Sequence, residues 1–180
     1  MTPENPIKDL TQFNWGGMAS PTEYDVPKCG EGVFGCTKMT DGHWTHTMNG
    51  TWTVGDMHPS PSRKNEPEPR NGTGVRFLSI HGHCHAPTCI QFDLFNAETN
   101  EIICSQRPLY GNGAGHFQEE GYLNIPPCVF GSEAEGLISP PGGDKGLPFA
   151  TRLFSKKTCH ADYAHHGEMS LWQTYGELVA

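Results

Sequence analysis

Three histidines alternate with other residues in the short segment from His81 to His85. Because successive side chains of a β-strand point to opposite faces, His81, His83 and His85 would all project from one face of a strand. Neutral imidazole is the commonest metal ligand among the side chains, and its ring nitrogen suits divalent and cuprous ions. The spacing therefore predicts a metal site built on this strand.

A second cluster of candidate functional side chains lies far downstream and contains His160, Glu168 and Met169. A thioether is a soft, weak donor that selects copper, above all Cu(I), over zinc or iron. A methionine by itself is more often part of a core than a metal ligand. The sequence around Met169 is therefore needed to choose between these two roles.

The two clusters together resemble the second domain of the copper type II, ascorbate-dependent monooxygenases, the group of peptidylglycine α-hydroxylating monooxygenase and dopamine β-monooxygenase. In that family a His-x-His pair on one strand and a distant methionine hold the copper ion at which dioxygen is activated. The resemblance covers roughly residues 75–175 and leaves the partner of His83 open. The matching residues are His83 with either His81 or His85, the segment 128–131, His160 and the segment 167–169.

This resemblance implies an antiparallel β-sandwich that holds copper, as Cu(I) or Cu(II), with two imidazoles and one thioether. Such a ligand set leaves one coordination position open for dioxygen, and ascorbate or another external reductant would supply electrons. The resemblance implies catalytic roles for His83, His85 and Met169, and it keeps His81 and His160 as further candidate metal ligands. The expected substrate is a small molecule or a peptide.

Two features depart from the pattern of the family. Its other copper ion lies on three histidines in a preceding domain of similar size, and the residues before position 75 are too few for such a domain. The cysteine that follows the copper methionine in the family is replaced here by Ser170. A non-catalytic copper module for storage, delivery or sensing therefore stands as an alternative to a mononuclear copper oxygenase or oxidase.

A cupin-like enzyme with iron or zinc at a histidine site is another alternative, because cupins also carry a His-x-His pair on a strand. Cupins place a glutamate four or five residues beyond the second histidine, whereas the first acidic residue after His85 is Asp93. Cys84, which lies between two histidines, could instead contribute to a zinc site of mixed His and Cys ligands. Both alternatives stay open at the level of sequence.

The seven cysteines allow up to three disulfides and leave one thiol over. Cys29 and Cys36 bracket a short loop that a disulfide could close. This cysteine content favours an oxidising compartment, so that a secreted or periplasmic protein is expected. Disulfides that staple the sandwich, rather than thiolate ligands, are expected for Cys84, Cys89, Cys104 and Cys128.

Charge and hydropathy exclude two classes of partner. A net charge of −8, from 20 acidic and 12 basic residues, argues against a nucleic-acid partner, which requires a basic patch. No window approaches the roughly 18 consecutive apolar residues of a membrane-spanning helix, and the first ten residues lack the pattern of a signal peptide. We therefore expect a soluble protein with neither nucleic acid nor membrane as partner.

Short strands must position these residues. The chain has 22 glycines and 15 prolines, which interrupt helices, and no segment shows a convincing amphipathic helix pattern. We expect an all-β protein, an antiparallel β-sandwich or jelly roll with long Gly- and Pro-rich loops. Residues 1–74 would form an N-terminal arm with short strands and a Pro-rich loop at 58–74, and residues 75–180 the sandwich, in one compact domain overall.

Local signals predict three further details. The pair Asn49-Gly50 predicts a hairpin turn between two short strands. Apolar runs separated by turn residues between positions 75 and 110 predict a meander of three strands. The Gly-rich loops at 111–115 and 131–148 could shape a substrate cleft.

Overall fold

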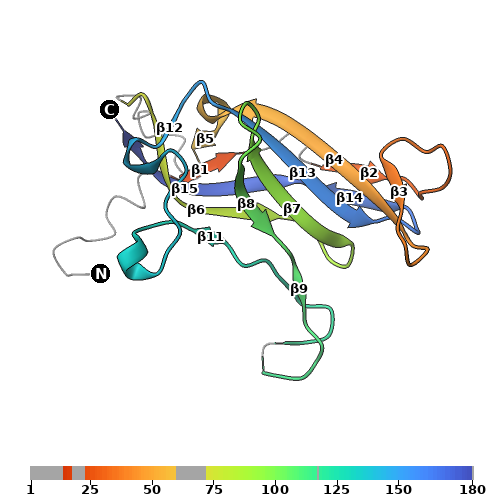
Figure 1. Cartoon of the computed structure of the whole chain (residues 1–180). Helices are drawn as coiled ribbons and strands as arrows, with labels where there is room; N and C mark the ends of the chain where they lie inside the picture. Colours follow the sequence, from red (N-terminus) through yellow and green to blue (C-terminus); the bar gives the residue numbers. More distant parts are fainter. Residues whose placement is uncertain (1–13, 18–22, 60–71, 117, 180) are drawn as a thin grey trace.

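The protein is an antiparallel β-sandwich, all-β as the sequence predicts (Figure 1). Its computed structural model contains no α-helix in the described residues, and accordingly no helix there is long and apolar enough to cross a membrane. The connections between strands that the structure describes include three single turns of 3-10 helix: η1 (Val54–Asp56), η3 (Glu133–Glu135) and η4 (Gly143–Lys145). The structure describes residues 14–17, 23–59, 72–116 and 118–179.

Two large sheets and two ribbons make up the described part of the chain. The first sheet has the order β11 (Cys128–Val129), β6 (Gly74–His83), β15 (Leu171–Val179), β1 (Asn14–Gly17) and β5 (His58–Pro59), with β12 (Leu147–Pro148) also beside β6. The second sheet has the order β3 (Cys36–Lys38), β4 (Trp44–Thr53), β13 (Arg152–His160), β7 (Cys89–Asn96) and β8 (Ile102–Gln106). The ribbons pair β14 (His165–Met169) with β2 (Glu23–Val26), and β9 (Leu109–Tyr110) with β10 (Leu123–Asn124).

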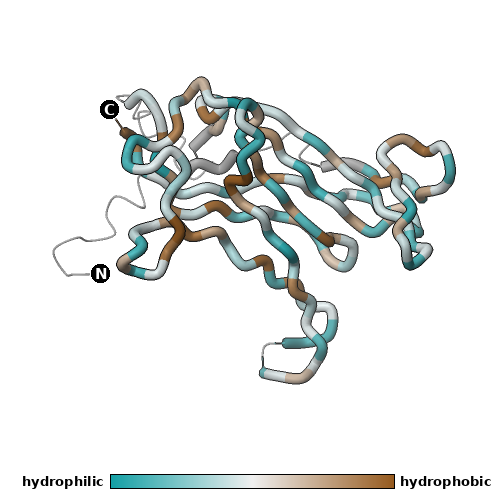
Figure 2. Tube along the Cα trace, in the orientation of Figure 1, coloured by the Kyte–Doolittle hydropathy of each residue, from teal (hydrophilic) through white to brown (hydrophobic). Residues whose placement is uncertain are grey.

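The core lies between the two sheets. Apolar and polar residues alternate along the strands, which is the period of two that a sheet with one buried face requires (Figure 2). Trp172 of the first sheet is fully buried against Phe92 of the second, with their ring centres 5.2 Å apart in an edge-to-face arrangement. The indole nitrogen of Trp172 donates a hydrogen bond to Ser155 Oγ, so this large polar ring is buried with its one donor satisfied.

The expected hairpin at Asn49-Gly50 is wrong. β4 continues straight through both residues, because Asn49 is paired with Lys156 and Gly50 with Ser155 on the neighbouring strand β13. The ladder between β4 and β13 extends from the beginning of β4 to its end. Pairing along a whole strand outweighs the local preference of an Asn-Gly pair for a turn.

The expected three-strand meander is only partly right. β7 and β8 form an antiparallel pair, but β6 is paired with β15, β11 and β12 and not with β7. The connection 84–88 therefore crosses from the first sheet to the second at one end of the sandwich. This crossing begins directly after His83, so it carries the last of the clustered histidines.

Three disulfides are present, as the sequence predicts: Cys29 with Cys36, Cys84 with Cys89, and Cys104 with Cys128. Cys159 is the free and buried thiol. The disulfide from Cys104 to Cys128 joins β8 of the second sheet to β11 of the first. Because Cys84 is bonded to Cys89, the alternative of a thiolate ligand at Cys84 is excluded for this state of the protein.

Removing the disulfide between the sheets should destabilise the protein more than removing the disulfide at Cys29 and Cys36. The two bonds join residues 24 and 7 positions apart. Loop-closure entropy then predicts that replacing both cysteines by alanine costs about 3.5 kcal/mol for Cys104 and Cys128 and about 2.5 kcal/mol for Cys29 and Cys36. Urea unfolding without reductant measures both losses, and an equal or reversed order would contradict the expectation.

Candidate metal site

The clustered histidines lie where β6 ends. His81 and His83 are half-buried, His85 just beyond the strand is exposed, and the residues between them, Gly82 and Cys84, are buried. This alternation places the three histidines on the outer face of the first sheet, as the spacing predicts, and turns Gly82 and Cys84 toward the core. The core residues therefore fix the strand while its histidines remain accessible.

Close packing against the second sheet explains why a glycine lies between His81 and His83. A Cβ atom at Gly82 would lie 3.1 Å from the ring of Phe92 and 2.9 Å from Gln106 Oε1, both on the second sheet. The backbone N–H of Gly82 donates to the same Gln106 oxygen at 2.6 Å. Only a residue without a side chain lets the second sheet approach so closely, and this contact holds the end of β6 in place.

Met169 is the last residue of β14, which is paired with β2, and it lies shortly before the start of β15, the strand beside β6. His83 is paired with Leu171 in the register of β6 and β15, so Met169 lies two residues before the partner of His83. Burial alternates from Glu168 to Trp172 without a break, although β14 ends at Met169 and β15 begins at Leu171. Glu168 and Trp172 are buried, and Met169 and Leu171 therefore face outward with His83.

The rings of His83 and His85 lie close together, with their centres 5.4 Å apart and their planes nearly perpendicular. Burial lowers the pKa of His83, and the charges of His85, His81 and Lys157 lower it further. A lowered pKa favours the neutral imidazole, which is the form that offers a lone pair to a metal ion. The structure thus brings the rings of His83 and His85 together and favours the neutral, lone-pair-bearing form of His83.

A buried ion pair lies directly behind this face. The side chains of Lys157 and Glu168 are 0% and 4% exposed, and Lys157 Nζ lies 2.5 Å from Glu168 Oε2. Lys157 Nζ also donates to the backbone oxygen of Met169 and lies 5.6 Å from the ring centre of Phe92. Burial lowers the pKa of Lys157, whereas its bond to Glu168 acts in the opposite direction.

The same glutamate is connected to the loop that carries His85. Thr88 is buried, and its hydroxyl donates to the second carboxylate oxygen of Glu168. Both oxygens of Glu168 therefore have partners, one on β13 and one in the connection 84–88. Lys157, Glu168 and Thr88 form one buried network that joins the segment before Met169 to the segment after His85.

His160 belongs to a different group, although its backbone N–H donates to the oxygen of Thr88 at 2.8 Å. Its side chain is exposed, and its charge acts on the carboxylate of Asp162. Asp162 Oδ2 lies 2.7 Å from His43 Nδ1, and Oδ1 accepts the backbone N–H of Trp44. These contacts lower the pKa of Asp162, with the Trp44 bond contributing most, and the Asp162 bond raises the pKa of His43.

The rings of His83 and His85 thus lie together, the alternation of burial turns His81 and Met169 outward, and His160 lies in the group of Asp162. In the part of the chain that the structure describes, no group of three or more His, Cys, Asp and Glu side chains could hold a metal ion. Asp93, the first acidic residue after His85, lies on the second sheet and is held there by Gln91 and Ser105.

Sequence reasoning missed the roles of Lys157 and Thr88. A signal was present for the lysine, because it shares the inward period of two along β13 with Leu153, Ser155 and Cys159. A cation at an inward position must have a buried partner. The partner itself comes from another strand, so the sequence could not identify it.

Comparisons with families of known proteins, with curated proteins and with solved structures found no match to this chain. The features of the candidate site are the adjacent rings of His83 and His85, the outward position of Met169 and the buried network of Lys157, Glu168 and Thr88.

Breaking the buried ion pair should destabilise the protein strongly. Lys157→Met leaves the carboxylate of Glu168 buried without its cation, and Glu168→Gln leaves the ammonium group without its anion, so each should lower the free energy of unfolding by about 3–5 kcal/mol. The double variant Lys157→Met, Glu168→Gln should lose much less than the sum, because neither charge remains.

Urea unfolding of the four proteins measures this coupling. The matched control is Lys156→Met, because Lys156 is the neighbouring lysine of the same strand and is exposed. Its free energy of unfolding should change by no more than about 0.5 kcal/mol. Additive losses in the double variant would show that the two side chains do not stabilise each other.

Proposed function

We propose that His83, His85 and Met169 bind one copper ion and that the protein is a mononuclear copper oxygenase or oxidase. The observation that supports this proposal is the register that pairs His83 with Leu171, because Met169 lies only two residues before Leu171 and has the same outward position in the alternation of burial. Residues far apart in the sequence supply the donors, and the sandwich fixes both segments.

The donor set fits copper by its chemistry. Two imidazoles and a thioether are soft to intermediate donors, and a thioether favours copper, Cu(I) above all, over zinc or iron. Two rings that bind one ion through nitrogen atoms about 2 Å from it have their centres about 5 Å apart. The separation of 5.4 Å between the rings of His83 and His85 agrees with that value.

The position of Met169 favours His85 over His81 as the partner of His83. His81 is paired with Gln173, on the side of Leu171 that leads away from Met169. If the register of β6 and β15 continued by two residues, Met169 would lie opposite His85. We therefore propose His85 as the partner of His83, and His81, on the same strand, remains the alternative that the experiment below tests.

The chain supplies a rigid but accessible support for the proposed site. The buried network behind Met169 holds the backbone of this residue, and the disulfide from Cys84 to Cys89 closes the loop that carries His85. His85 is exposed, so a substrate can reach the outer face from solvent. Positioned donors and open access are what an oxygen-activating centre requires.

A bound copper ion would supply electron transfer and a binding position for dioxygen. Monooxygenation places one oxygen atom of dioxygen in a C–H bond of the substrate and reduces the other atom to water. Two electrons from an external reductant such as ascorbate, together with two protons, balance the reaction. The resemblance to the copper type II monooxygenases in the His-x-His pair and the distant methionine supports this choice of reaction.

Copper binding should depend on the two imidazoles and the thioether to different degrees. His83→Ala and His85→Ala should each weaken copper binding by about 100-fold or more, since even the loss of an outer hydrogen-bond partner of a ligand costs about 10-fold to 100-fold. Met169→Ile should weaken Cu(I) binding by about tenfold and Cu(II) binding much less, because the thioether is a soft donor.

Competition with chromophoric Cu(I) and Cu(II) chelators measures these affinities in protein without a histidine tag. His160→Ala and Met39→Ile are the controls, because Met39 is an exposed methionine and His160 lies with Asp162. Both should bind copper like the wild type. Loss of binding in His81→Ala with normal binding in His85→Ala would show that His81 is the partner of His83.

Activity separates the enzyme from a non-catalytic copper module. Copper-loaded protein should consume dioxygen with ascorbate in the presence of its substrate, and Met169→Ile should reduce the rate at least about tenfold while its unfolding curve stays unchanged. An oxygen electrode measures the rate. Tight copper binding without oxygen consumption on any substrate would favour storage or delivery of copper.

A further inference from the structure

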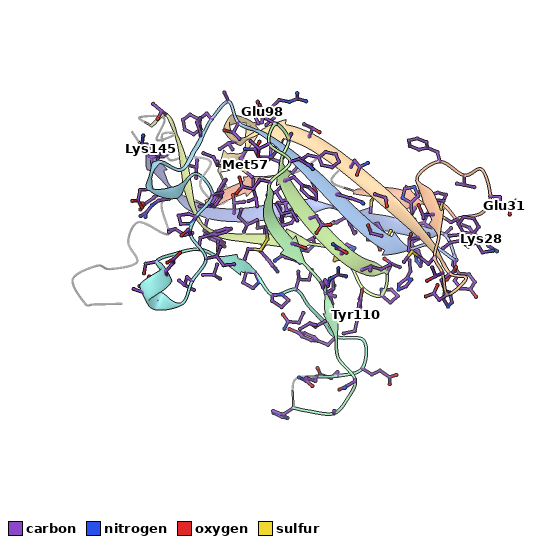
Figure 3. All side chains as sticks on the ribbon, viewed as in Figure 1. Lys28, Glu31, Met57, Glu98, Tyr110 and Lys145 are labelled. Carbon is purple, nitrogen blue, oxygen red and sulfur yellow. A yellow bond between two sulfur atoms is a disulfide. The ribbon has the colours of Figure 1, made fainter. Side chains whose placement is uncertain are left out.

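A pocket of about 520 Å³ lies on the ribbon that projects from the sandwich between β9 and β10. Figure 1 shows this hairpin extending away from the two sheets, and Figure 3 labels Tyr110 where β9 leaves them. The volume is within the range of about 300–1,000 Å³ that is typical of small-molecule sites. The lining residues are Leu109, Tyr110, Gly111, Asn112, His116, Gln118, Tyr122 and Asn124.

The pocket presents exposed aromatic and aliphatic surface in a fixed orientation. The side chains of Leu109, Tyr110 and Tyr122 are exposed to solvent by 56%, 38% and 54%. The hydroxyl of Tyr110 donates to the backbone oxygen of Cys89 at 2.8 Å, so this ring is held while part of it remains open. Burial and the charge of Glu168 raise the pKa of Tyr110 to about 12, which keeps the hydroxyl protonated as a donor.

The polar groups of the pocket are neutral amides. Asn112, Gln118 and Asn124 each offer a donor and an acceptor, and Asn112 is oriented by the backbone N–H of Ala114, which donates to its side-chain oxygen at 3.0 Å. Among the lining residues that the structure describes there is no Asp, Glu, Lys or Arg, and His116 contributes an imidazole.

These features select one class of ligand. Anionic ligands are usually held by Lys or Arg side chains and amines by Asp or Glu side chains, and none of these is among the lining residues that the structure describes. A purely apolar ligand would leave the amides without partners. A neutral sugar matches both surfaces, because its hydroxyl groups donate and accept hydrogen bonds and its C–H face packs against an aromatic ring.

We propose that the pocket between β9 and β10 binds a neutral saccharide. Tyr110 connects the pocket to the proposed copper site, because its hydroxyl bonds to Cys89 and the disulfide from Cys89 leads to Cys84, between His83 and His85. The saccharide would be the substrate of the proposed copper site. Its role as substrate rests on the proposed function, whereas its binding does not.

Binding is measured by isothermal titration calorimetry on the full chain, with and without copper. The probes are hexasaccharides of neutral sugars: cellohexaose, laminarihexaose, maltohexaose, mannohexaose and N-acetylchitohexaose. Tetragalacturonate, phenethylamine and an uncharged capped pentapeptide represent anions, amines and peptides. At least one neutral saccharide should bind, and it should bind equally well after copper is removed with a chelator.

Two variants locate the binding. Tyr122→Ala and Asn124→Ala should each weaken saccharide binding by about tenfold or more, since an aromatic contact and a neutral hydrogen bond are each worth about 1 kcal/mol or more in a site. Both side chains are exposed, so the fold should persist. Tyr163→Ala is the matched control, because Tyr163 is an exposed tyrosine outside the pocket and should bind like the wild type.

The outcomes separate the pocket from the metal site. Saccharide binding that is lost in Tyr122→Ala and Asn124→Ala supports the pocket even if copper does not bind. Copper binding without binding of any neutral saccharide overturns the pocket and leaves the copper site in place. Binding of the anion, the amine or the peptide in preference to the saccharides, or saccharide binding that both variants retain, also overturns it.

Discussion

The buried ion pair between Lys157 and Glu168 is the interaction on which the arrangement of the candidate site depends. A charge buried between two sheets without a partner strongly destabilises a protein. Each of these two side chains is therefore stable at its buried position only while the other is present. The pair joins β13 of the second sheet to β14, and Thr88 extends it to the connection after β6. One network therefore positions both segments that carry proposed ligands, although none of its members is itself a proposed ligand.

At this end of the molecule, the alternation of side chains along the strands separates the residues that pack in the core from the residues proposed to bind metal. Inward positions are filled by Gly82, Glu168 and Trp172, which meet the second sheet, while outward positions are left to His83 and Met169. The outward residues therefore do not have to fill space in the core. A site built this way gains the rigidity of a packed sheet and keeps access to solvent, which loops alone would not provide together.

Features that depend on the local alternation of residues and on composition could be predicted from the sequence. Features that depend on pairing between strands far apart in the sequence could not. The all-β fold, the shared face of the histidines and the loop closed by Cys29 and Cys36 follow from spacing within a few residues. The hairpin at Asn49-Gly50 did not form, because β13 pairs with β4 along its whole length. The partner of Lys157 and the position of Met169 relative to β6 depend on the register between strands. That register cannot be inferred from any one segment of the sequence.

The connection 84–88 joins the proposed metal site to the proposed saccharide pocket. Its disulfide fixes the loop that carries His85, its end at Thr88 bonds to Glu168, and the oxygen of Cys89 accepts the hydroxyl of Tyr110 from the pocket. A displacement of this crossing would therefore shift the proposed ligands and the pocket together. Reactions at a bound substrate lose rate steeply when the reacting groups are misplaced by about 1 Å. A short, cross-linked crossing between two sheets is the kind of support that keeps such displacements small.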